Sequence, residues 1–94
     1  MPSAEGVPAP DQNGPKAHRP LYIIAADIRA NWKKPALPAF PYIFALRHLD
    51  RATDYFGADS AKNIIAYFLA NARTWQGPEA CRIKTELKTI LEGN

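Results

Sequence analysis

Two apolar-striped segments joined by a short turn occupy residues 59–91 and constrain the fold more than any other part of the sequence. In the first segment, apolar residues recur at steps of three and four, which is the spacing of one helix face. They are Ala61, Ile64, Ile65, Phe68, Leu69, Ala72 and Trp75. The second segment repeats the pattern with Ala80, Ile83, Leu87, Ile90 and Leu91. Gly77 suits the end of a helix and Pro78 the first turn of the next. The pattern predicts two neighbouring helices, either antiparallel or crossing steeply as in a helix-turn-helix.

Two further helices are predicted upstream, at residues 20–32 and 42–56. The first stripe consists of Leu21, Ile24, Ala25 and Ile28, and the second of Tyr42, Ala45, Leu46, Leu49, Ala52 and Phe56. Residues 33–41 contain three prolines at intervals of three, which predicts an extended connector because proline disfavours helix in the residue before it. No segment alternates apolar and polar residues for long enough to be a strand. The predicted fold is therefore all-α, a compact bundle of about four helices.

The first 19 residues differ in composition from the rest of the chain. They contain four prolines and almost no large apolar side chains to offset the entropy of ordering, which predicts a disordered Pro-rich N-terminal tail. Residues 20–94 are then a single helical domain. The chain has one cysteine, which excludes an internal disulfide and suits a reducing cytoplasm. The start of the chain has no apolar run typical of a signal peptide, and no stretch approaches the roughly 20 apolar residues of a membrane span.

No group of side chains predicts catalysis or metal binding. Cys81 lies near the start of the last predicted helix, but a nucleophile there needs a base, and the candidates are His18 and His48. A small structural residue is the simpler interpretation of this cysteine. These three residues are far apart in the sequence and form no zinc-ligand spacing.

The carboxylates favour ion pairing over acid–base chemistry. Asp50 and Asp54 lie one helical turn apart, but Arg47 and Arg51 stand beside them, as in a solvated ion-pair face. The glycines form no phosphate-binding loop. We therefore expect a protein that is not an enzyme and needs no cofactor.

The last predicted helix, together with the end of the helix before it, carries bases that would suit DNA recognition in a helix-turn-helix. The candidate nucleic-acid-binding residues are Arg73, Arg82, Lys84 and Lys88. Acidic residues alternate with these bases, however, so the last helix has three bases and three acids. The net charge of +3 over the whole chain is only weak support for binding to phosphates.

The residues around the end of the first helix are the candidates for binding another protein. Trp32 lies beside Lys33 and Lys34, with Arg29 one turn earlier. Amphipathic rings at helix ends often anchor protein interfaces, although packing in the core is the favoured interpretation for each aromatic residue.

Several stretches resemble a group of short uncharacterised proteins of actinobacteria and their phages, including mycobacteriophages. The similarity lies in residues 24–35, 41–42, 67–75 and 77–87, and residues 36–40 depart from it. The resemblance implies a phage or mobile-element setting in the host cytoplasm, with no established activity. The leading hypothesis is a non-enzymatic accessory protein that binds a host or phage protein through a helical surface. A small DNA-binding regulator and a self-assembling structural protein are the alternatives.

Overall fold

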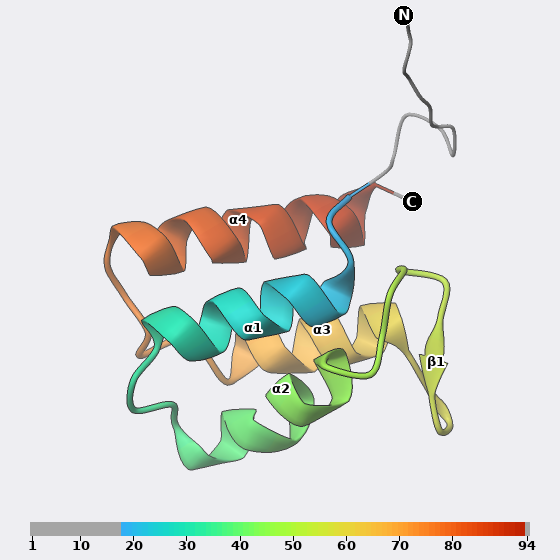
Figure 1. The fold of residues 1–94 in the computed structure, drawn as a ribbon, viewed down its shortest axis with the longest axis horizontal. Coiled ribbons are helices and arrows are strands. Elements are labelled where there is room, and N and C mark those ends of the chain that lie inside the picture. Colours follow the sequence, from blue (N-terminus) through green and yellow to red (C-terminus); the bar gives the residue numbers. More distant parts are fainter. Residues whose placement is uncertain (1–17, 94) are drawn as a thin grey trace, which may run out of the picture.

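Four α-helices make up most of the computed structural model, which describes residues 18–93. The helices are α1 (Leu21–Asn31), α2 (Phe40–Leu46), α3 (Ala61–Ala70) and α4 (Pro78–Glu92), with a short 3₁₀ turn η2 (Leu37–Ala39) before α2. Consecutive helices run in alternating directions, with α1 between α4 and α2 and α3 behind it (Figure 1). The predicted helical bundle is confirmed in this coarse form. The predicted tail lies outside the described residues apart from His18 and Arg19.

The helices form a ring in which each packs against two others. Both α1 and α3 contact α2 on one side and α4 on the other. The predicted stripes supply the core, including Leu21, Ile24 and Ile28 from α1, Ile64, Ile65 and Phe68 from α3, and Ile83 and Leu87 from α4. Apolar residues at steps of three and four lie on one side of each helix, so closing the ring buries most of the stripe residues together.

Two tryptophans close one end of this core. Trp32 follows α1 and Trp75 precedes α4, and their rings stack with centroids 5.1 Å apart and planes at 9°. Phe68 meets both indoles edge-on, at 6.2 Å from Trp32 and 6.5 Å from Trp75. Such offset or edge-on aromatic pairs add about 0.5–1.5 kcal/mol each to the burial of their area.

The connection between α3 and α4 is longer than predicted. Helix α3 ends at Ala70, where the Asn71 side chain donates to the Tyr67 carbonyl at 2.8 Å. Gly77 has a positive φ of 112°, but it begins α4 instead of ending α3, so its predicted role is wrong. Turns between these points bring Ala72 and Trp75 back into the core. The two helices form an antiparallel pair, one of the two predicted arrangements (Figure 1).

The prediction of a helix over residues 42–56 is wrong beyond Leu46, where α2 ends. The Asp54 carboxylate accepts the backbone N–H groups of Asp50 at 3.0 Å and Arg51 at 2.9 Å. Such side chain–backbone bonds compete with a helical ladder. They replace the ion pairs that the sequence predicted for Asp50 and Asp54.

A small hairpin takes the place of the last predicted turns of that helix. Strand β1 (Tyr55–Phe56) pairs antiparallel with β2 (Asp59–Ser60), and Gly57 in the loop has a positive φ of 64°. The prediction of no strand is therefore wrong at this point. The strands contain two residues each, too few for alternation of apolar and polar residues to signal them.

The proline-rich connector is shorter than predicted and is partly helical. It contains η2, and α2 begins at Phe40 with Pro41 in its first turn. Proline fits there because its missing N–H would have no partner in the helix. This early start places Phe40 and Phe44 one turn apart on α2.

Candidate protein-binding groove

The four predicted nucleic-acid-binding residues do not form one surface. Arg82 donates through Nη1 to Asp27 Oδ2 on α1 at 3.1 Å and through Nε to Glu79 Oε1 at 2.9 Å. Lys84 donates to the Ala72 backbone carbonyl at 2.8 Å, and burial lowers its pKa. Arg73 and Lys88 are exposed. Two of the four bases therefore hold protein groups together.

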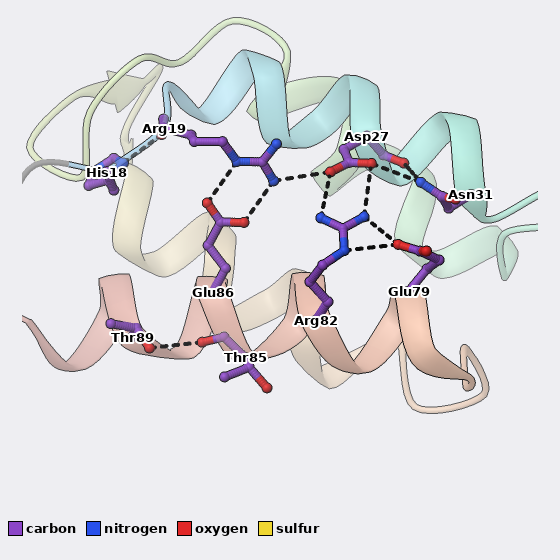
Figure 2. Close-up of polar contacts among 9 residues, drawn as sticks. All are labelled: His18, Arg19, Asp27, Asn31, Glu79, Arg82, Thr85, Glu86 and Thr89. Carbon is purple, nitrogen blue, oxygen red and sulfur yellow. Dashed lines mark hydrogen bonds and ion pairs between the residues drawn. The ribbon is translucent and has the colours of Figure 1, made fainter.

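An ionic network centred on Asp27 joins α1 to α4 and to the segment before α1 (Figure 2). Arg19 donates to Glu86 through Nε at 2.9 Å and Nη2 at 2.7 Å, and its Nη2 also reaches Asp27 Oδ2 at 3.1 Å. Asn31 donates to the other oxygen of Asp27 at 2.8 Å. With Arg82 and Glu79, the network contains three carboxylates and two guanidinium groups. This excess of negative charge makes the α1–α4 face unfavourable for phosphates.

Stability is expected to fall in acid as Asp27 takes up a proton. The hydrogen bond from Arg82, and then that from Arg19, holds the pKa of Asp27 below its usual value, with burial opposing them. A carboxyl group with a lowered folded-state pKa stabilises the fold above its unfolded pKa of about 3.9, and this stabilisation is lost as the pH falls through the folded-state value. The free energy of unfolding of the wild type and Asp27→Asn should differ by a constant amount above about pH 5 and converge below about pH 4. Urea titrations at a series of pH values measure this difference, and parallel curves down to the acid end would contradict the assignment.

The predicted protein-binding residues separate into core and surface. Trp32 is only 7% exposed, because its ring lies against Trp75 and Phe68. Trp32 therefore packs in the core, the interpretation favoured from the sequence for each aromatic residue, and does not present its ring as an anchor for a partner. Lys33 and Lys34 are exposed directly after α1, and Arg29 is exposed on α1 itself.

Arg29 lines an open groove of about 390 Å³ between α1 and α2. The other lining residues are Phe40, Pro41, Ile43, Phe44 and Arg47. Ile43 is only 1% exposed, whereas Phe40 and Phe44 are 40% and 53% exposed. The groove thus has an apolar floor, half-exposed aromatic side chains and an arginine from each side.

The aromatic surface continues from the groove towards the hairpin. Phe44 meets the His48 ring edge-on at 4.8 Å and the Phe56 ring at 6.1 Å. His48 in turn stacks on Phe56 at 5.6 Å. These contacts hold Phe44 in place while half of it stays in contact with solvent. A contiguous exposed apolar surface of this kind often marks an interaction site.

Sequence reasoning did not identify this groove apart from Arg29. A signal was available, because Phe44 lies off the apolar stripe that was predicted for residues 42–56. A large aromatic residue outside the buried stripe of an amphipathic helix has to be exposed or covered by another molecule. The presence of Arg47 in the groove could not be predicted from the apolar stripe, since its position depends on how α2 lies beside α1.

The remaining candidates for chemistry stay apart in the structure. Cys81 is exposed on α4, whereas His48 lies against the aromatic rings at the end of α2. Within residues 18–93, no cluster of three or more metal-ligating side chains is present. Over the same residues, no helix is both long and apolar enough to cross a membrane.

Comparison of the chain with protein-family models, curated proteins and solved structures gave no match. The groove is therefore interpreted from its own geometry and charge.

Proposed function

We propose that this chain is a non-enzymatic phage or mobile-element accessory protein that binds a host or phage protein through the groove between α1 and α2. The observation that carries the proposal is the exposure of Phe40 and Phe44 beside a buried apolar floor. Aromatic side chains in such positions are the usual anchors of protein interfaces. The phage setting, in the host cytoplasm, follows from the sequence resemblance.

The lining of the groove supports binding of a protein more than catalysis. Its six described residues are apolar or arginine, without a carboxylate, thiol, hydroxyl or imidazole for acid–base or nucleophilic chemistry. Nucleic-acid binding has less support, because Arg82 and Lys84 are engaged with protein groups. A DNA-binding regulator remains the alternative that the following experiment separates from the proposal.

The test is an affinity capture from an actinobacterial host lysate with the tagged full chain, run with and without nuclease. The baits are the wild type, Phe44→Ser and the control Tyr55→Ser, which removes a more exposed ring at 69% from the hairpin. We expect one protein to be retained by the wild type and the control after nuclease treatment. Phe44→Ser should retain about tenfold less, the effect of losing an interface hot spot.

Far-UV circular dichroism of each bait establishes that the variants are folded. Equal capture by all three baits would contradict the assignment to the groove. Recovery of mainly nucleic acid, abolished by nuclease or by added salt, would favour the DNA-binding alternative.

A further inference from the structure

We infer that the groove between α1 and α2 binds an amphipathic helix whose apolar face is bordered by Asp or Glu side chains. This inference rests on the proposed function and adds the chemical class of the partner. It follows from the charge of the groove, from its shape and from the spacing of its residues.

All the charged side chains in the segment that forms the groove are basic. Residues 28–49, from the end of α1 to the segment after α2, contain Arg29, Lys33, Lys34 and Arg47 and no acidic residue. The one carboxylate on α1, Asp27, is bound by Arg19 and Arg82 on the side facing α4. Within residues 18–93, neither Arg29 nor Arg47 makes an ion pair. A partner with acidic residues on both sides of its apolar face would satisfy both guanidinium groups.

A second copy of the chain is a poor occupant for the same reason. A two-fold contact through this face would bring the same arginines of both copies together. Residues 28–49 offer no acid to compensate for this repulsion. The partner must therefore supply the negative charge.

The shape favours a helix over a membrane surface. Anionic lipids would also match a basic, aromatic face, but they require apolar side chains that protrude into the bilayer. Here the buried Ile43 and the half-exposed Phe40 and Phe44 line one hollow of about 390 Å³, so the surface is concave. A concave apolar groove receives side chains from a partner.

The spacing along both walls fits a helix lying in the groove. On α2, Phe40, Phe44 and Arg47 follow steps of four and three. On α1, the exposed Tyr22 and Ala26 lie seven and three residues before the lining residue Arg29, so they share its face of the helix. The 11 residues of α1 extend over about 16 Å, so about three turns of a partner helix would lie alongside it.

The probe for this inference is a fluorescein-labelled amphipathic peptide of about 16 residues with leucines at helical spacing and glutamates beside them. Its matched control carries lysine in place of every glutamate. Binding to the full chain is measured by fluorescence anisotropy at about 50 mM and about 300 mM salt. We expect the acidic peptide to bind at least about tenfold more tightly than the basic one, with a smaller preference at high salt.

Charge reversal in the groove gives the decisive comparison. The double variant Arg29→Glu, Arg47→Glu should lose the preference for the acidic peptide and bind the basic one more tightly. Arg73→Glu reverses an exposed arginine after α3 and should leave the preference unchanged. Circular dichroism verifies the fold of each variant.

Three binding results would overturn the inference. They are equal binding of both peptides, no binding of either, and binding of anionic phosphatidylserine vesicles without binding of the acidic peptide. Dimerisation that sedimentation shows to depend on Phe44 would also overturn it, in favour of self-association. If lysate capture depends on Phe44 but the acidic peptide is not preferred, the proposed function stands and this inference fails. If capture does not depend on Phe44, the proposed function fails as well.

Discussion

Replacing Trp75 with alanine is expected to unfold most of the domain at room temperature. The indole is 4% exposed, stacks on Trp32 and receives the edge of Phe68. Deleting a buried tryptophan side chain costs about 3–5 kcal/mol, because burial is lost and a cavity remains. A single core in a domain of this size rarely supplies more than about 3–5 kcal/mol, so the loss is comparable with the total stability.

Urea unfolding followed by far-UV circular dichroism measures this effect without relying on the deleted fluorophore. Leu37→Ala is the control, because the Leu37 side chain is 80% exposed and its loss should change the free energy of unfolding by less than about 0.5 kcal/mol. An unfolding midpoint for Trp75→Ala equal to that of the wild type would show that the tryptophan stack does not support the core.

The second large effect is expected at Asp27, where alanine should lower the free energy of unfolding by about 1.5–3 kcal/mol. This carboxylate accepts hydrogen bonds from Arg19, Arg82 and Asn31, and its side chain is only 19% exposed. Its removal leaves Arg19 with only Glu86 and Arg82 with only Glu79 as carboxylate partners, and it deletes the ion pair between α1 and α4. The same loss should weaken the attachment of Arg19, which precedes α1.

Glu79→Ala is the matched control for Asp27→Ala. Glu79 pairs with Arg82 three residues later on the same helix, and its side chain is 54% exposed. An exposed pair within one helix contributes little to stability, so its loss should be several-fold smaller. Denaturant unfolding of both variants, at low and high salt, measures the difference, and equal losses would contradict the central role of Asp27.

The core and the proposed binding surface use different residues of the same helices. On α2, Ile43 and Leu46 are buried, whereas Phe40 and Phe44 stay half-exposed. Substitutions in the groove should therefore change binding with little change in stability. This separation is what allows the Phe44 and arginine variants to report on the partner instead of the fold.

Three of the four helices were predictable from periodicity alone. The apolar stripes of α1, α3 and α4 coincide with the residues that the structure buries, apart from the half-buried Leu69 and Leu91, because a helix face is read directly from steps of three and four. The end of α2 was not predictable in this way. Its stripe continues through Leu49 to Phe56, but the backbone carbonyl of Leu49 accepts the Tyr22 N–H at the start of α1. That bond depends on a neighbour distant in the sequence.

The candidate site was predictable only in part. The sequence singled out Arg29 and the lysines after Trp32 as a basic corner, and their role in binding stays a prediction. It did not place Arg47 in one groove with Arg29, because that requires α1 and α2 to lie antiparallel. It also ranked Arg82 among surface bases, since its partner Asp27 is 55 positions away in the chain.

Residue spacing alone indicates which side of each long helix is buried and that the chain forms a helical bundle, because both depend on local periodicity and on the hydrophobic effect. The packing of the helices sets which side chains meet between them. It stacks Trp32 on Trp75, directs Arg82 to Asp27 and leaves Phe44 half-exposed beside two arginines. These outcomes follow from the order in which the helices pack around the ring, and residue spacing within one helix carries no information about that order.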